Sequence, residues 1–175
     1  MSFNLSRFRA QVKDWLRPYS YEVIIQPPGA SSVGGRQITL RTEAVTLPGG
    51  TFMTVDNFKP YGSGLVLNIP YAQNVQEITC THTVDSKGEM FQRFYDWMDS
   101  IADMNDDRKF TAGYYNDYVR TMQILLYDLK GRRVREYELL EAFPMSVSQT
   151  PMSWASAQEV TKIEVTYRYR NHVIK

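Results

Sequence analysis

Apolar and polar residues alternate most regularly near the end of the chain, between Lys162 and Arg170. A strand points successive side chains to opposite faces of its sheet, so this alternation predicts a strand with one buried and one exposed face. The residues expected in the core are Ile163, Val165, Tyr167 and Tyr169. Those expected on the exposed face are Lys162, Glu164, Thr166, Arg168 and Arg170.

Two further strands are predicted near the start of the chain, at residues 21–26 and 36–46. The first is rich in β-branched residues, and a segment rich in glycine and proline separates the two, which favours a hairpin. In the second strand one face is expected to carry Ile38, Leu40, Thr42 and Ala44, and the other Gln37, Thr39, Arg41 and Glu43.

Residues 47–64 combine glycines and prolines with large apolar side chains, namely Phe52, Met53, Val55, Phe58 and Tyr61. A solvated loop does not usually carry so many apolar groups. The segment is therefore expected either to fold back as an extra hairpin or to lie against something outside its own domain.

Residues 64–84 are predicted to form two strands joined near Tyr71–Asn74, with Pro70 placing the first at a sheet edge or at its own end. In the second strand Ile78, Cys80, His82 and Val84 share a face by their spacing of two. Two potential ligands, Cys80 and His82, are too few for a zinc site, so we expect them to pack in the core.

A short amphipathic helix is predicted over residues 1–18, where Pro18 ends a pattern formed by Leu5, Phe8, Val12, Trp15 and Leu16. Its apolar face is expected to pack on the parent domain or to dock on another subunit.

The main helix is predicted to follow Ser86–Glu89, which has the form of a capping box. Its apolar stripe consists of Met90, Phe91, Phe94, Trp97, Met98 and Ile101. The opposite face is acidic and includes Asp96, Asp99 and Asp103.

A second hairpin is expected from strands at 117–129 and 132–143, with Gly131 in the connection. Its tip carries Lys130, Arg132, Arg133 and Arg135, close in sequence to Glu136, Glu138 and Glu141, which favours contact with an acidic protein surface over nucleic-acid binding. The predicted elements are about seven strands in antiparallel hairpins and two helices. The fold class is therefore mainly β (α+β), an antiparallel sandwich or barrel with one capping helix and a short N-terminal helix.

The composition indicates one folded domain over 1–175, because hydrophobic residues make up 43% of the 175 residues and no composition break divides the chain. Lysine and arginine number 20 against 19 acidic residues, so no net charge attracts nucleic acid or an anionic membrane. No apolar run approaches membrane-spanning length, and the arginines near the start do not fit a signal peptide. The single cysteine, Cys80, is compatible with a reducing cytoplasm.

No motif in the sequence indicates catalysis. The two histidines, His82 and His172, have no evident nucleophile beside them, and nucleotide-binding and zinc motifs are absent. Asp103, Asn105 and Asp107 alternate as in a calcium loop, but Arg108 replaces its required glycine and Tyr114 its bidentate glutamate. We therefore expect no enzyme, no cofactor and no metal, and predict an interaction or assembly protein.

Several fragments, taken in order, resemble the tail tube proteins of contractile-tailed bacteriophages. They are RPYSYEVII, EAVTLPGG, FYDWMDSI and FPMSVSQTPMSWASAQEVTKIEVTYRY, which together extend from about Arg17 to Tyr169. The last fragment is the most specific, with an aromatic-proline step, a serine-tryptophan turn and a final strand. Ala155 and Gln158 depart from the residues usual in that turn.

The resemblance implies a structural virion protein whose hexameric rings stack into the inner tube of a contractile tail. It implies that DNA passes through the lumen without specific binding, and that the tube penetrates the host envelope when the sheath contracts. The implied partners are other copies of the chain, the tail sheath protein, and the baseplate and terminator proteins. Assembly is expected in the host cytoplasm. A tube-end protein, or the tube of a phage-derived injection system, remains the alternative.

The resemblance also suggests roles for three sets of residues. Phe52, Met53, Val55, Phe58 and Tyr61, in the long inter-subunit loop or hairpin at 47–64, are candidates for contacts between subunits. Asp96, Asp99 and Asp103 are candidates for facing the sheath. Lys162, Glu164, Arg168 and Arg170 are candidates for facing the lumen or a neighbouring subunit.

Overall fold

The computed structural model describes residues 16–29, 38–58, 62, 66–102, 112–153 and 159–175. The strands are β1 (Tyr21–Ile24), β2 (Thr42–Val45), β3 (Gly50–Phe58), β4 (Leu67–Val75), β5 (Ile78–Thr83), β6 (Arg120–Tyr127), β7 (Arg133–Val147), β8 (Lys162–Arg168) and β9 (Asn171–Ile174). The helices are α3 (Glu89–Ile101) and α4 (Tyr115–Tyr118). The predicted mainly β, antiparallel class is confirmed, although the described strands do not close into a barrel.

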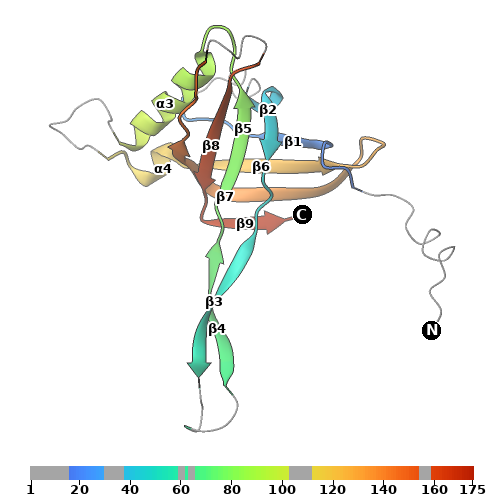
Figure 1. The fold of residues 1–175 in the computed structure, drawn as a ribbon, viewed down its shortest axis with the longest axis vertical. Coiled ribbons are helices and arrows are strands. Elements are labelled where there is room, and N and C mark those ends of the chain that lie inside the picture. Colours follow the sequence, from blue (N-terminus) through green and yellow to red (C-terminus); the bar gives the residue numbers. More distant parts are fainter. Residues whose placement is uncertain (1–15, 30–37, 59–61, 63–65, 103–111, 154–158) are drawn as a thin grey trace.

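One large sheet has the strand order β1-β6-β7-β8-β5-β2, and β9 also pairs with β7. The 15-residue strand β7 belongs to both parts of this sheet: its first part pairs with β6 and β9, and its last part with β8. In Figure 1, β1, β6 and β9 run across the view, whereas β8, β5 and β2 run along its long axis. Strand β7 therefore connects the two parts of the sheet, whose strands run in different directions.

Glu141 lies where β7 turns. Between Arg120↔Ala142 and Met122↔Leu139, one residue of β6 faces two residues of β7, which is a β-bulge. Glu141 has φ +56, a left-handed conformation that L-residues other than asparagine and aspartate rarely adopt. The bulge and this backbone conformation together produce the bend.

Helix α3 packs on the inner face of β5 and β8. The rings of Phe94 and His82 have centroids 5.1 Å apart, and those of Trp97 and Tyr167 are 6.1 Å apart. The indole nitrogen of Trp97 donates a 2.8 Å hydrogen bond to the carbonyl of Tyr118, which fixes α4 beside α3. The predicted capping role of the main helix is thus confirmed, as is the burial of Ile78, Cys80, His82, Ile163, Val165, Tyr167 and Tyr169.

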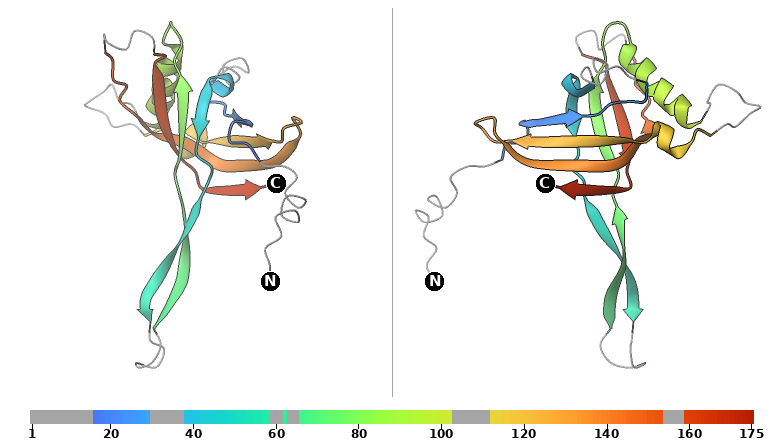
Figure 2. Two further views of the ribbon diagram at one scale, coloured as in Figure 1. Left: turned by 45° about the vertical axis from the view of Figure 1, so that its right-hand side comes forward. Right: turned by 180° about the vertical axis from the view of Figure 1, so that it is seen from behind.

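Among the strands that the structure describes, β3 and β4 pair only with each other and form a long antiparallel hairpin that projects from the rest of the molecule (Figure 1). Both views of Figure 2, turned by 45° and seen from behind, show the same projection. We call this hairpin, residues 50–58 with 67–75, the arm.

The structure corrects the predicted hairpin of residues 21–26 with 36–46. Strand β1 pairs with β6 and β2 pairs with β5, so the two segments do not pair with each other. Residues 38–40 are helical and only Thr42–Val45 forms a strand. Ile38 is therefore buried while Leu40 is 78% exposed, although both were assigned to one strand face.

The predicted turn near Tyr71–Asn74 is also wrong, because β4 runs through it to Val75. The capping box is not formed: the residue before α3 is Gly88, with φ +70 and no side-chain cap. Instead, the amide of Met90 donates to a carboxylate oxygen of Asp85 at 3.4 Å. The second hairpin is confirmed by the pairing of β6 with β7, but α4 and β9 were not predicted.

The predicted N-terminal helix and the candidate calcium segment lie mostly or wholly outside the described residues, as do Tyr61 and Asp103. Phe58 ends β3, and its side chain is not described.

Candidate assembly surfaces

The outer face of β8 carries Lys162, Glu164, Thr166 and Arg168, as the sequence predicted, whereas Arg170 lies in the turn that follows the strand. Strand β8 lies between β5 and β7, and Lys162, Glu164 and Arg168 alternate with buried residues of the core. On β5, Thr83 lies opposite Lys162, Thr81 opposite Glu164 and Thr79 opposite Thr166. Because α3 occupies the inner side, this outer face presents hydroxyl groups and a few charges. We call it the β8 face; it consists of residues 162, 164, 166, 168 and 170 with Glu43, Glu77, Thr79, Thr81 and Thr83.

The cations of the β8 face are paired with carboxylates from other segments. Nζ of Lys162 lies 2.6 Å from Oε1 of Glu43 in β2. Nη2 of Arg168 lies 3.6 Å from Oε1 of Glu77, in the link before β5. Nη1 of Arg170 lies 2.8 Å from Oε1 of Glu141 in β7. The sequence indicated the cations but not their partners, because strand pairing over long separations brings the partners close.

The carboxylate of Glu141 interacts with two side chains, those of Arg170 and Tyr115. Its other carboxylate oxygen accepts a 2.9 Å hydrogen bond from the hydroxyl of Tyr115 in α4. The bond from Arg170 and then that from Tyr115 hold the pKa of Glu141 below its usual value. The strained residue at the bend of β7 thus connects α4 to the turn between β8 and β9.

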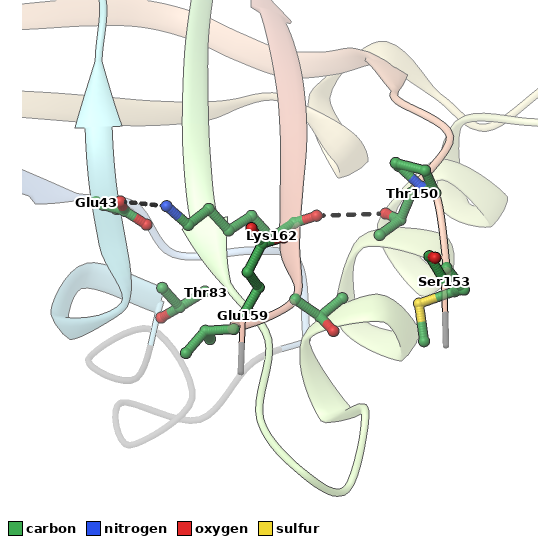
Figure 3. Close-up of a pocket in the computed structure, with 10 residues that line it drawn as sticks. Glu43, Thr83, Thr150, Ser153, Glu159 and Lys162 are labelled. Carbon is green, nitrogen blue, oxygen red and sulfur yellow. Dashed lines mark hydrogen bonds and ion pairs between the residues drawn. The ribbon is translucent and has the colours of Figure 1, made fainter. Parts of the chain in front are cut away.

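A pocket of about 750 Å³ opens at the end of the β8 face where β8 begins and β5 ends. Figure 3 shows Lys162 in this pocket, reaching Glu43 on one side while its carbonyl accepts a 3.4 Å hydrogen bond from Thr150 on the other. The lining also includes the exposed apolar residues Met152 and Val160. The pocket holds one ion pair and no catalytic arrangement of the side chains that the structure describes.

The arm exposes apolar side chains on both of its strands. In β3, Phe52 is 68% exposed, and Met53 and Val55 are also exposed. In β4, Leu67, Ile69 and Tyr71 are exposed, and the hydroxyl of Tyr71 donates to the sulfur of Met53 at 3.6 Å. A two-stranded hairpin of this kind has no core of its own, so its apolar surface is available to another molecule.

Of the candidate acidic residues, the two that the structure describes, Asp96 and Asp99, lie on α3. Asp96 is exposed and accepts a 2.6 Å hydrogen bond from the amide of Gln92, while Asp99 is partly buried. Tyr95 is exposed beside them.

The tip of the β6–β7 hairpin has fewer unpaired cations than its sequence indicated. Arg132 pairs with Asp128 at 3.0 Å, and Arg133 pairs with Glu136 at 2.8 Å. The predicted contact of this tip with an acidic partner stays a prediction.

The buried titratable residues lie in positions that suit packing. Burial raises the pKa of the Cys80 thiol to about 12, so it is not a nucleophile at neutral pH. Burial lowers the pKa of His82 to about 4, so the ring is neutral there. Among the described residues, no three His, Cys, Asp or Glu side chains gather as they would around a metal ion.

No helix in the described part of the chain is long and apolar enough to cross a membrane.

A sequence model of the phage tail tube protein family matches residues 16–175. The chain belongs to this family. It is 24% identical over 155 residues to tail tube protein gp19 of Enterobacteria phage T4, covering 87% of this chain and 88% of that protein. The corresponding protein of Enterobacteria phage T6 has the same identity and coverage.

Solved structures share the fold. A chain of the PVC sheath–tube complex, from an extracellular contractile injection system in its extended state, matches with a TM-score of 0.62 and 17% identity, covering 99% of both chains. A chain of the anti-feeding prophage baseplate matches with a TM-score of 0.65 and 11% identity, covering 100% of this chain and 97% of that one. The family expected from the sequence is therefore the family found, and its members are structural proteins of the tail.

Proposed function

We propose that this chain is the repeating subunit of the inner tube of a contractile phage tail. Six copies form a ring, and the rings stack into a hollow tube that conducts DNA and penetrates the host envelope when the sheath contracts. The protein is then a component of the virion, assembled in the cytoplasm of the host. The family match over residues 16–175 supports the tube, and the directions of the strands suggest how a ring closes.

The observation that carries the ring is the four-strand order β2-β5-β8-β7, in which each neighbouring pair is antiparallel. The outer strands β2 and the last part of β7, residues 143–147, therefore run in opposite directions. Within the described residues, neither has a strand partner on its outer side. Copies in the same orientation around an axis can thus pair β7 with β2 of the next copy, which leaves no open edge.

In such a ring the β8 face lines the lumen, because α3 covers the other side of the sheet. The arm, with Phe52, Met53 and Val55, reaches a neighbouring subunit in the same ring or the next. Phe58 and Tyr61 belong to the same proposed contact. The acidic side of α3, with Asp96 and Asp99, faces the sheath, and Asp103, which follows the helix in the sequence, belongs to the same proposed contact. The baseplate and terminator proteins contact the ends of the tube.

Two of the solved structures support a second candidate function, that of a ring at the end of the tube. The solved chains with this fold include one from the baseplate of the anti-feeding prophage and one from the PVC sheath/tube terminator, with TM-scores of 0.65 and 0.63. A tube-end ring, or the tube of an injection system derived from a phage, therefore has the same fold support as the main tube.

Electron microscopy of the purified protein separates these functions. Long hollow tubes with six-fold symmetry are expected for the main tube or for the tube of an injection system. Single rings that do not stack would support the tube-end protein instead. A uniform monomer at high protein concentration would contradict both.

A further inference from the structure

We propose that Glu43 and Glu77 mask the cations of the β8 face, so that a polyanion passing along it meets no free positive charge. This inference rests on the proposed function, since it takes the β8 face as the lining of the lumen. The two carboxylates would then have the role of preventing DNA from binding, rather than that of stabilising the sheet.

The described residues of this face show complete pairing of the cations. Lys162, Arg168 and Arg170 are the only lysines and arginines in β2, β5, β8, the turn after β8, and residues 143–147 of β7, and each has a carboxylate within 4.0 Å. Glu164, in contrast, is exposed and has no ion-pair partner among the described residues. Counting Glu141, the β7 partner of Arg170, the four carboxylates Glu43, Glu77, Glu141 and Glu164 therefore exceed the three cations by one.

The geometry of these pairs suits charge masking more than stabilisation. The side chains of Lys162 and Glu43 are 49% and 44% exposed, and those of Arg168 and Glu77 are 59% and 36% exposed. Ion pairs so exposed contribute little to folding stability. Seen from a distance beyond the Debye length, about 8 Å at physiological salt, each pair has no net charge.

Unmasked cations would have a large effect, because the subunits repeat along the tube. Each lysine or arginine that neutralises a phosphate releases counterions and strengthens binding, and many copies act on one DNA molecule. The hydroxyl groups of Thr79, Thr81 and Thr83 make the rest of this surface polar. Among its described residues, the surface carries no unpaired cation.

The test compares two double variants with the same change in net charge. Glu43→Gln with Glu77→Gln uncovers Lys162 and Arg168. Glu159→Gln with Glu164→Gln removes two exposed carboxylates that have no ion-pair partner among the described residues, so it uncovers no cation. Assembled tubes of each variant and of the wild type are sedimented with short fluorescent double-stranded DNA over a range of salt concentrations.

The uncovering variant is expected to retain at least about tenfold more DNA than the wild type at about 50 mM salt. Two phosphate contacts alone predict a loss of about tenfold of this retention by about 200 mM, and since many copies act on one DNA molecule the loss should be at least that large. The control variant should retain much less. Adding Lys162→Gln and Arg168→Gln to the uncovering variant should abolish the gain. If the double variant fails to assemble, each single variant should show part of the gain.

Equal retention by the uncovering and control variants would overturn the inference, because net charge alone would then explain it. So would an uncovering variant that retains no more DNA than the wild type. A wild-type protein that forms neither rings nor tubes contradicts the proposed function itself, and electron microscopy shows this before any DNA is added.

Discussion

Nδ1 of His82 lies 3.1 Å from Oγ1 of Thr42, and this contact joins β5 to β2 within the core. The hydroxyl of Thr42 donates its one hydrogen to the carbonyl of Ile38 at 3.0 Å, so its oxygen accepts from Nδ1–H of the imidazole. Nε2 is then the nitrogen without a hydrogen, and it faces the hydroxyl of Tyr167 at 3.5 Å. Protonation of His82 would place a charge at Nε2 in a buried site.

Stability is therefore expected to fall between about pH 6.5 and pH 4. Burial lowers the pKa of His82 from 6.5 to about 4. In this window the unfolded chain binds a proton that the folded chain does not, so the free energy of unfolding decreases as the pH falls, by about 3 kcal/mol in total. Urea denaturation of the unassembled chain at several pH values measures this decrease.

His82→Gln is the control, since glutamine keeps hydrogen-bonding capacity but does not titrate. Its stability should change much less than that of the wild type between about pH 6.5 and pH 5, above the range in which Glu138 and Glu141, whose pKa values are lowered by bonds from Lys175 and Arg170, contribute. An unchanged slope there would assign the pH dependence to another group. The neighbours of His82 do not interfere, because burial raises the pKa of Cys80 to about 12 and that of Tyr167 well above its usual value. Asp85 titrates below this window: despite its desolvation, hydrogen bonds from Met90 and the charge of Arg41 lower its pKa.

The backbone strain at Glu141 can be separated from its side-chain contacts. Glu141→Ala and Glu141→Gly both lose the bonds to Tyr115 and Arg170, but only alanine retains the unfavourable left-handed conformation. The glycine variant is therefore expected to melt about 3 °C higher than the alanine variant, with both below the wild type. Differential scanning calorimetry measures the order. A glycine variant no more stable than the alanine variant would show that Glu141 is not strained.

Period-two alternation was a reliable guide where a strand has one face in the core. It predicted the buried residues of β5 and β8 because each of these strands packs against α3 on one side only. The same reasoning failed at Ile38 and Leu40, because residues 38–40 are helical and the two side chains therefore point in different directions. A pattern of two or three positions is too short to distinguish a turn from a strand.

Pairing between distant segments was not predictable from local pattern. Strand β1 pairs with β6, about a hundred residues later in the chain. The local pattern instead indicated the nearer segment 36–46 as its partner, which is wrong. In β4, Pro70 and the polar residues after Tyr71 resembled a turn. The structure instead has a register shift there, between Met53↔Ala72 and Thr54↔Pro70, and such an irregularity accommodates a residue without an amide hydrogen.

The charges of the candidate surfaces were visible in the sequence, but their pairing was not. Lys162, Arg168 and Arg170 were correctly placed on an exposed face. Glu43, Glu77 and Glu141 reach them from three other segments, so only the fold shows that the cations are not free.

The acidic side of α3 is expected to bind the sheath through its charge. Asp96→Asn should weaken co-assembly of sheath with preformed tubes by about twofold to fivefold, as the loss of one exposed charge contact predicts, and Asp96→Lys should weaken it more. Binding of purified sheath protein to tubes at several salt concentrations measures both. Tubes of the wild type and of both variants should look alike by electron microscopy. Equal sheath binding by all three proteins would contradict a sheath-facing role for this helix.

The apolar side chains of the arm are expected to drive assembly without stabilising the subunit. Phe52→Ser with Val55→Ser should leave the melting temperature of the unassembled chain nearly unchanged, because both side chains are exposed and the main-chain pairing with β4 remains. If they are buried between subunits, each contributes about 1.5 kcal/mol or more. The protein concentration needed for tubes should then rise at least about tenfold for each residue, as sedimentation measures. Leu129→Ser with Val134→Ser, exposed at the other hairpin, is the control, and an equal effect of both pairs would contradict a special role for the arm.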